Sequence, residues 1–339
     1  MTAPEQARAE AGAQPQASAP ADEQPQASAP AGNGHPMTAA EAIARIPAWQ
    51  GHDVRWEELG GGITNHNYIV WVDGGPENGG GKYVLRVPGQ GTDMFIDRAN
   101  ERDCMIQAAK AGVGPEVVYV IEPEGAMVIA FVDGEIMHPE TMAGHPARIR
   151  QAVETARRVH ERAIFKHEIH VFEMIRGYVK IAREIGAPMP ERLTAMLKAL
   201  DDIEAACARD QPRPAACHND LLSENFIVDA SGRMWIIDWE YGGMTDPYFD
   251  LGDFVMEHPF SRAEERLVIE AYCGRMDEKR FARMMLYKMV SGVWWGVWAM
   301  IQHTVSKIEH DYMDWGMERV ARAEAVVADP EYPAWLALV

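Results

Sequence analysis

The sequence of 339 residues has only four cysteines, and no two of them lie close together. The wide separation of Cys104, Cys207, Cys217 and Cys273 argues against a zinc motif and against a disulfide scaffold. Long apolar runs are also missing, because the longest uncharged one, MVSGVWWGVWAMI (289–301), is too short to cross a bilayer. The opening residues MTAPEQARAEAG lack the apolar core of a secretory signal. These absences predict a cytoplasmic protein without membrane insertion.

Positive charge is scarce relative to negative charge. The chain has 32 Lys and Arg residues against 51 Asp and Glu residues, a formal net charge of −19. Binding to nucleic acid or to an anionic membrane needs a cationic surface that this composition does not supply. An acidic chain suits a cationic substrate, although acidic surfaces more often only keep a protein soluble.

The composition changes along the chain and predicts three segments. Residues 1–36 are rich in Ala, Pro and Gln, contain PQASAP twice, and are expected to be a disordered tail. Residues 37–133 contain five strand patterns and one helical pattern that Gly112 closes, which predicts a small antiparallel sheet with one long helix. Residues 134–339 have mostly helical periodicity, interrupted by the short strands FIVD and RMWIID. This is an α+β fold with two lobes, a small sheet lobe and a larger helical lobe.

The stretch CHNDLLSENF (217–226) carries the strongest chemical signal. His218, Asp220 and Asn225 form the pattern HxDxxxxN, and Asp238 follows at the end of the apolar run MWIID. Phosphoryl transfer needs a group that orients the attacking hydroxyl and oxygen ligands for Mg²⁺. We predict that Asp220 orients the hydroxyl, that Asn225 and Asp238 bind the metal, and that His218 braces the loop. The alternative is a polar turn, in which Asn and Asp are common.

Three motifs together resemble the choline/ethanolamine kinases, in the aminoglycoside-phosphotransferase-like group of the protein-kinase-like fold. They are CHNDLLSENF, IIDWEYGG and YFDLGDFVME, and the resemblance extends from about Leu59 to Ala325. It implies a two-lobe kinase that uses ATP and Mg²⁺. Residues 37–133 would then be the nucleotide-binding lobe, and residues 134–339 would bind the acceptor and carry out catalysis.

The resemblance also implies a phosphate-covering loop in LGGGITNHNYIV. Gly61, Gly62, Thr64 and Asn65 occupy it, and glycine permits a close approach of the backbone to phosphate oxygens. A plain hairpin turn is the alternative. The segment AFVDG (130–134), with Phe131 and Asp133, would be the hinge that meets adenine.

Arg86 in KYVLRVPG takes the place of the lysine that protein kinases use at the α- and β-phosphates. The resemblance implies that Glu101, on the following helix, pairs with Arg86 and orients it. Lys82 shares a strand face with Arg86 and is the competing candidate. For a single Arg and Glu, a surface ion pair of little energetic value is the alternative.

The segment SGVWWGVWAMIQHTVSKIEHDYMDWGMERV (291–320) is expected to form the acceptor pocket. Trp295 and Trp298 share a helix face, and Trp315 lies three residues after Tyr312. Clustered aromatic residues are most often core, but quaternary ammonium ions are bound by aromatic faces. Matched to the family motifs, Trp295, Trp298, Trp315 and Glu257 are the substrate-binding residues.

Three positions qualify this match. Asp250 matches a family aspartate and is expected to brace the catalytic loop. Trp315 stands where choline kinases often have tyrosine, which keeps the cage because tryptophan is the better cation–π partner. Leu222 stands where some relatives have glutamine, so one polar contact near the reacting hydroxyl is absent.

Choline is the favoured acceptor, because three tryptophans suit a trimethylammonium group. The alternatives are ethanolamine or another amino alcohol, an aminoglycoside, and a catalytically dead kinase-like domain that only binds a ligand. An aminoglycoside needs a wide acidic cleft, and no acidic block stands in the pocket segment. His160, His167 and His170 are near one another in sequence, and we expect exposed or capping side chains rather than a metal site.

Overall fold

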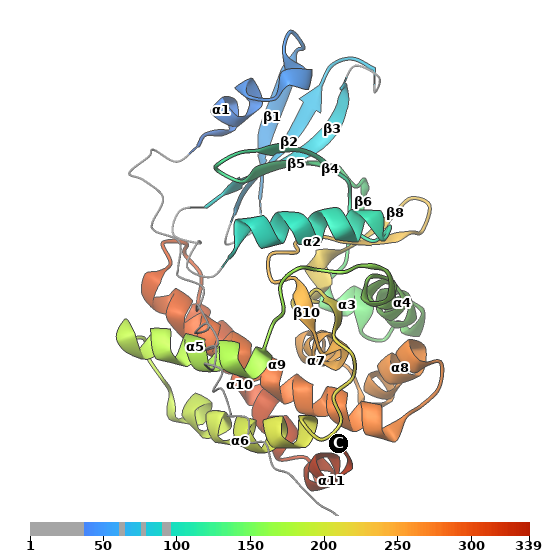
Figure 1. Cartoon of the computed structure of the whole chain (residues 1–339), viewed down its shortest axis with the longest axis vertical. Coiled ribbons are helices and arrows are strands. Elements are labelled where there is room, and N and C mark those ends of the chain that lie inside the picture. Colours follow the sequence, from blue (N-terminus) through green and yellow to red (C-terminus); the bar gives the residue numbers. More distant parts are fainter. Residues whose placement is uncertain (1–36, 61–64, 76–78, 90–95) are drawn as a thin grey trace, which may run out of the picture. The chain divides into compact units, whose positions relative to one another are not determined.

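The computed structural model describes residues 37–60, 65–75, 79–89 and 96–339. Its first part is a five-stranded antiparallel sheet in the order β1-β2-β3-β5-β4 (Figure 1). The bounds of its strands are β1 Val54–Leu59, β2 Asn65–Val72, β3 Gly81–Pro88, β4 Val117–Ile121 and β5 Ala126–Ala130.

Strand β3 places Arg86 on the side of the sheet that faces helix α2 (Arg98–Lys110). Side chains alternate between the two faces of a strand. Leu85 and Val87 pack with helix α1 (Ala39–Ala44) and the 3₁₀ turn η1 (Pro47–Trp49) on one face. Val84 joins the core cluster of the other face, which includes residues of α2. Arg86 therefore points toward the helix that carries Glu101.

Helix α2 begins later than the apolar pattern of residues 94–112 predicts. The carboxylate of Asp97 accepts hydrogen bonds from the backbone N–H groups of Ala99, at 2.9 Å, and Asn100, at 3.1 Å. This N-cap fixes the start of the helix at Arg98. Gly112, with φ of +74°, follows the end of the helix, as the sequence predicts.

The remainder of the chain is mostly helical and contains two small sheets. Strand β7 pairs with β10, and β8 lies between β6 and β9. The strands are β6 Gly134–Ile136, β7 Ala215–Cys217, β8 Phe226–Asp229, β9 Met234–Ile236 and β10 Gly243–Thr245. The helices before and among them are α3 Pro139–Met142, α4 Pro146–Arg162, α5 Val171–Glu184, α6 Glu191–Cys207 and the 3₁₀ turn η4 Ser223–Asn225. Those after them are α7 Pro247–Glu257, α8 Arg262–Cys273, α9 Glu278–Val305, α10 Tyr312–Val327 and α11 Tyr332–Leu338.

Helix α9 is the centre of the helical part and packs against α5, α6, α7, α10 and α11. Its residues 289–301 are buried on every side, so this long apolar run is core. The approach of α10 to α9 depends on Gly316, where a Cβ atom would lie 2.4 Å from the Cβ of Ala299. This close approach brings Trp315 beside the tryptophans of α9.

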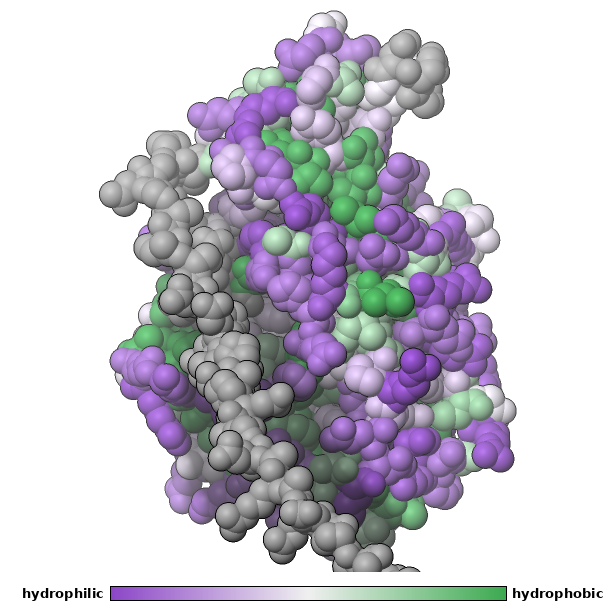
Figure 2. All heavy atoms as spheres, in the orientation of Figure 1, coloured by the Kyte–Doolittle hydropathy of each residue, from purple (hydrophilic) through white to green (hydrophobic). Residues whose placement is uncertain are grey.

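Helix α7 has no exposed face, because every residue from Pro247 to Glu257 is buried. It lies between the catalytic segment and α9, with contacts to both β7 and α9. Among the described helices, none combines the length and the apolar character needed to cross a membrane. Hydrophilic residues cover most of the face shown in Figure 2, and hydrophobic residues lie between them in separate patches.

Candidate active site

The segment His218–Asn225 connects β7 to β8 and is bent around two buried carboxylates of α7. Asp250 accepts hydrogen bonds from the backbone N–H groups of His218, at 3.0 Å, and Asn219, at 2.6 Å. Asp253 accepts one from Leu221, at 2.6 Å. Asn219 takes a left-handed backbone conformation, with φ of +67°. The backbone on both sides of Asp220 is therefore fixed from the same helix.

The His218 ring points into the protein rather than toward a substrate. It is fully buried, its Nε2 donates to the carbonyl oxygen of Ile237 at 2.8 Å, and it packs against Trp239 with ring centroids 4.6 Å apart. Burial lowers the pKa of His218. The neutral ring thus connects the catalytic segment to the backbone just before Asp238.

Asp220, Asn225 and Asp238 are brought together by short-range contacts. The side-chain Nδ2 of Asn225 donates to the backbone oxygen of Asp220 at 2.8 Å and lies 3.3 Å from its Oδ2. The backbone oxygen of Asn225 accepts the N–H of Ile237 at 3.0 Å. Asp238 has φ of +67°, so strand β9 ends at Ile236, two residues earlier than the sequence predicts.

Asp220 lies in a strongly acidic environment. Burial raises its pKa well above the usual range, and the carboxylates of Asp253, Asp238, Glu257 and Glu240 raise it further. These four acids come from the segments after β9 and from α7. The aromatic segment has no acidic block, but the fold supplies acidic groups from elsewhere in the chain.

Arg86 joins the sheet to this acidic group. Its Nη2 lies 2.9 Å from Oε1 of Glu101 and 2.7 Å from Oδ1 of Asp238, and the side chain is buried. Burial alone would lower the pKa of Arg86, but the charges of Asp238, Glu101 and Glu240 raise it. Lys82 is exposed, and its Nζ lies 3.6 Å from the ring centroid of Phe131. Of the two candidates, Arg86 is the one that contacts Glu101.

Of the other residues expected to bind the nucleotide, only some are among the described residues. Asn65 donates from Nδ2 to Oε2 of Glu240 at 3.2 Å, whereas Gly61, Gly62 and Thr64 lie outside the described residues. Phe131 is half-buried and donates its backbone N–H to the oxygen of Lys82 at 3.3 Å. Asp133 is exposed.

The donors near Asp238 are oxygen atoms, the type that Mg²⁺ prefers. Carboxylate oxygens of Glu101, Asp238 and Glu240 lie within 4.8 Å of one another. The Nδ2 of Asn225 donates to Asp220, which leaves its amide oxygen available as a metal ligand. The side chain of Asp238 is 28% exposed, so a metal can reach it. These residues fit a magnesium site.

The three predicted tryptophans form one aromatic cluster. Trp298 lies 5.7 Å from Trp295 and 5.7 Å from Trp315, measured between ring centroids, and Trp295 lies 6.3 Å from Trp315. Tyr241 packs edge-on against Trp295 at 5.2 Å. Trp294 stacks on Phe249 in the core, with ring centroids 5.2 Å apart, and also on Trp295 at 5.8 Å. Tyr241 was not predicted, although it stands only three residues after Asp238.

Glu257, predicted to bind the substrate, does not face this cluster as a free carboxylate. Arg319 binds it with two hydrogen bonds, Nε to Oε1 at 3.0 Å and Nη2 to Oε2 at 2.5 Å. The Arg319 guanidinium also lies 3.3 Å from the ring centroid of Trp315. An internal cation thus neutralises Glu257 and covers one face of Trp315. The sequence signal for Arg319 is its position four residues after Trp315.

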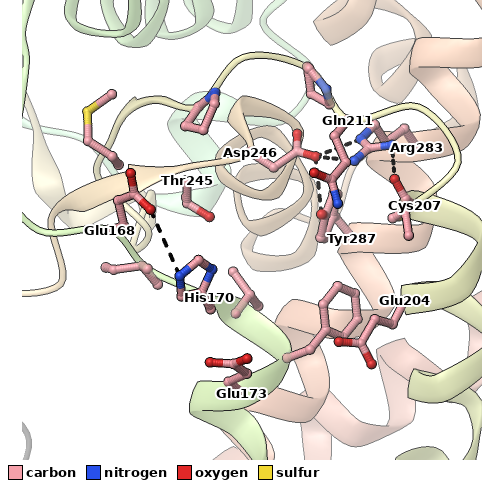
Figure 3. A pocket seen from close by; sticks show the side chains of 17 residues that line it. Glu168, His170, Glu173, Glu204, Cys207, Gln211, Thr245, Asp246, Arg283 and Tyr287 are labelled. Atoms are coloured by element: carbon pink, nitrogen blue, oxygen red, sulfur yellow. Dashed lines mark hydrogen bonds and ion pairs between the residues drawn. The ribbon is translucent and has the colours of Figure 1, made fainter. Parts of the chain in front are cut away.

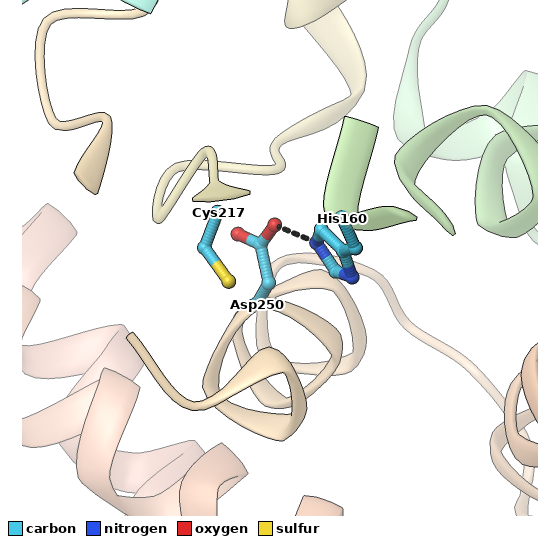
Figure 4. Close-up of side chains that lie close together, drawn as sticks. All are labelled: His160, Cys217 and Asp250. Carbon is cyan, nitrogen blue, oxygen red and sulfur yellow. Dashed lines mark hydrogen bonds and ion pairs between the residues drawn. The ribbon is translucent and has the colours of Figure 1, made fainter. Parts of the chain in front are cut away.

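The expectation that His160 is exposed or capping is wrong. Figure 4 shows its imidazole beside Asp250, and Nε2 lies 2.8 Å from Oδ2. Burial alone would raise the pKa of Asp250, but the hydrogen bond and charge of His160 lower it. The third side chain of this group is Cys217, whose thiol pKa is raised by burial. Asp250 accepts hydrogen bonds from three protein donors, so we call this group of buried side chains the bracket around Asp250. His167 and His170, in contrast, are exposed.

A cavity of about 420 Å³ lies elsewhere, among α5, α6, β10 and α9 (Figure 3). On one side of it, Asp246 accepts from Nε of Arg283 at 2.7 Å and from the hydroxyl of Tyr287 at 3.1 Å. None of the predicted site residues lines this cavity. It is separate from the site around Asp220.

Comparisons with known proteins identify the family of the chain. The model of the phosphotransferase enzyme family matches residues 55–285. A crystal structure of a choline/ethanolamine kinase family protein from Mesorhizobium loti is 32% identical, covers 88% of this chain and 97% of its own, and has a TM-score of 0.76.

Two further relatives are more distant. The choline kinase LicA from Streptococcus pneumoniae has a TM-score of 0.70 at 23% identity, with 85% of this chain and 97% of that one covered. Ethanolamine kinase 2 from Mus musculus is 27% identical over 80% of this chain and 76% of its own length. The fold is therefore that of the kinase-like phosphotransferases. The chain belongs to the phosphotransferase enzyme family and, within it, to the choline/ethanolamine kinase family.

Proposed function

We propose that this protein transfers the γ-phosphoryl group of Mg·ATP to the hydroxyl of choline, giving phosphocholine and ADP. The observation that carries the proposal is that one helix, α7, holds both the catalytic segment and the aromatic cluster. Its Asp253 accepts hydrogen bonds from the backbone beside Asp220 and from the indole of Trp295. The reacting hydroxyl and the cationic group of one small molecule could therefore be held at the same time.

Asp220 is the residue that would orient the hydroxyl and receive its proton as the new P–O bond forms. Its raised pKa favours proton uptake. Phosphoryl transfer depends mainly on positioning and on charge stabilisation. The bracket around Asp250 and the hydrogen bond from Leu221 to Asp253 hold Asp220 in place for this role.

Asn225 and Asp238 would hold Mg²⁺, which when bound neutralises the charge that develops on the transferred phosphate. Arg86, held by Glu101, would contact the α- and β-phosphates. Its contact with Asp238, which would bind the metal, supports this role. The loop with Gly61, Gly62, Thr64 and Asn65 would cover the phosphates. Phe131 and Asp133 would border adenine.

Trp295, Trp298 and Trp315 would bind the cationic end of the acceptor. Glu257 would act indirectly, by holding Arg319 against the ring of Trp315. A primary ammonium needs hydrogen-bond acceptors, whereas a trimethylammonium group needs aromatic faces. Each oxygen of Glu257 already accepts a hydrogen bond from Arg319, and the guanidinium balances its charge. This reduced capacity for a second cation supports choline over ethanolamine.

Ethanolamine is the second candidate, because a relative that covers most of this chain is named an ethanolamine kinase. An aminoglycoside would have to use the acidic residues around Asp220. A catalytically dead binder is disfavoured, because Asp220, Asn225 and Asp238 are all present and adjoining.

The test is to incubate the purified chain with Mg·ATP and choline and to identify the product by mass spectrometry and phosphorus NMR. We expect phosphocholine with wild-type protein and none with the Asp220→Ala variant. Formation of phosphoethanolamine alone, from a mixture of both amino alcohols, would reject choline as the acceptor and retain the kinase chemistry.

A further inference from the structure

We propose that Asp253 is a positioning residue that couples the acceptor pocket to the catalytic segment. One carboxylate holds the backbone next to Asp220 with one oxygen and the Trp295 ring with the other. The proposal rests on the proposed function for the roles of the segment and the pocket. The hydrogen bonds of Asp253 that support it are observed in the structure, whatever the substrate is.

The contacts divide between the two oxygens of Asp253. Oδ2 accepts the backbone N–H of Leu221 at 2.6 Å, and this is the peptide group that directly follows Asp220. Oδ1 accepts the indole Nε1–H of Trp295 at 2.8 Å and the hydroxyl of Ser291 at 2.7 Å. Asp253 is fully buried. It is therefore held by three protein donors, two of them on the helix that carries the aromatic cluster.

The neighbouring Asp250 shows why this arrangement is specific. Asp250 lies three residues earlier on the same face of α7 and also accepts backbone N–H groups of the catalytic segment. Its remaining partner is His160 on α4, whose other hydrogen-bond partner is the hydroxyl of Tyr272. Of the two carboxylates, Asp253 is the one that reaches both the catalytic segment and the pocket.

Three donors together fix the position of the buried Asp253 carboxylate. If the indole of Trp295 no longer donates, that position is less defined. The hydrogen bond to Leu221 is then weakened, and so is the placement of Asp220. A change in the pocket wall should therefore alter kcat as well as the KM of the acceptor.

The experiment compares Trp295→Phe with Trp294→Phe. The first variant keeps an aromatic ring but removes the donor to Asp253. The second is its matched control on the adjacent position, because the Nε1 of Trp294 has no hydrogen-bond partner among the described residues. Amide hydrogen exchange of a peptide that covers residues 217–226 is measured by mass spectrometry, and kcat and KM are measured in parallel.

We expect Trp295→Phe to speed exchange at Leu221 by about tenfold and to lower kcat by a similar factor, since each reflects one weakened hydrogen bond. Trp294→Phe should leave exchange in this peptide and kcat at wild-type values. Exchange and kcat both unchanged in Trp295→Phe would overturn the proposal. The exchange measurement needs no acceptor, so it stays decisive even if choline proves not to be the substrate.

A second comparison separates coupling from a general loss of stability. Asp253→Asn cannot accept hydrogen bonds on both sides, because its amide NH₂ would face a donor. Its effect on kcat should not multiply with that of Trp295→Phe: the double variant should be about as slow as Asp253→Asn alone. Effects that multiply, or a fall in kcat that only follows the loss of folded protein, would contradict coupling through Asp253.

Discussion

The guanidinium of Arg86 on β3 lies 2.7 Å from the carboxylate of Asp238, although 152 residues separate them in the chain. The same Nη2 lies 2.9 Å from Glu101. The buried guanidinium of Arg86 thus binds both Glu101, on α2, and Asp238, the predicted metal ligand. This contact joins the two parts of the site.

Replacement of Arg86 by Met should destabilise the fold by about 3 kcal/mol, because it leaves buried carboxylates without their cation. The added change Asp238→Asn should restore part of the free energy of unfolding but none of the activity. Urea unfolding followed by circular dichroism gives the first quantity, and ADP release the second. A stable Arg86→Met variant would mean that the ion pair is energetically unimportant.

Asp220→Ala should lower kcat by about 10²- to 10⁴-fold, the range for loss of a general base or orienting group. The Kd for Mg·ATP should change little, because Arg86 and Asp238 keep their contacts. Equilibrium binding by calorimetry tests the second statement. Near-normal turnover would show that Asp220 is not the residue that orients the hydroxyl.

Trp298→Ala should raise the KM for choline by about 30-fold, which corresponds to a cation–π contribution of about 2 kcal/mol in a desolvated site. Its kcat should change much less, because Trp298 has no contact with Asp253. Trp294→Phe controls for the loss of indole volume in the same helix. An unchanged KM would remove Trp298 from the acceptor pocket.

Arg319→Gln should shift the preference toward ethanolamine. Without the guanidinium, the Glu257 carboxylate is free to accept hydrogen bonds from a primary ammonium. We expect the ratio of kcat/KM for ethanolamine to that for choline to rise about tenfold, equivalent to about one charge-assisted hydrogen bond. The double variant Glu257→Gln/Arg319→Gln should return the ratio toward wild type; a ratio insensitive to Arg319 would contradict this role of Glu257.

The stability of the protein should depend on the protonation of His258. This buried ring lies 2.6 Å from Ser223 Oγ through Nε2 and 2.6 Å from the Phe254 oxygen through Nδ1. Burial lowers its pKa to about 4. In the unfolded chain, the histidine pKa is about 6.5, so the unfolded state binds the proton first as the pH falls. The stability present above pH ~6.5 is therefore lost as the pH falls toward ~4.

The loss should approach about 3 kcal/mol at the acidic end of this window. The free energy of unfolding, measured from pH 7 to 4, should fall more steeply in wild type than in His258→Gln. Parallel curves for the two proteins would assign the acid sensitivity to other groups.

The strands of the sheet lobe were predictable because apolar residues alternate along them between turn-forming glycines. Trp295 and Trp298 were predictable as neighbours because a spacing of three residues on a helix brings side chains together. Trp315 was added to them by the resemblance to the choline/ethanolamine kinases. Helix α7 was not predicted, although Asp250, Asp253 and Glu257 stand at helical spacing, because this polar face is buried instead of facing solvent.

The partners of two site residues could not be found from sequence spacing. Asp253 meets Trp295 from 42 positions away, and Arg319 meets Glu257 from 62 positions away. A single charged residue of either kind looks like a surface residue until the fold gives it a partner. His160 was misjudged for the same reason, since its partner Asp250 is 90 positions distant.

The most direct test of the account is the ratio of kcat/KM for a series of acceptors that differ only in N-methylation, from ethanolamine through its mono- and dimethyl forms to choline. The aromatic cluster around Trp298, with Glu257 neutralised by Arg319, predicts that kcat/KM rises with each methyl group. A constant or falling value along the series would contradict the tryptophan cage and with it the assignment of choline.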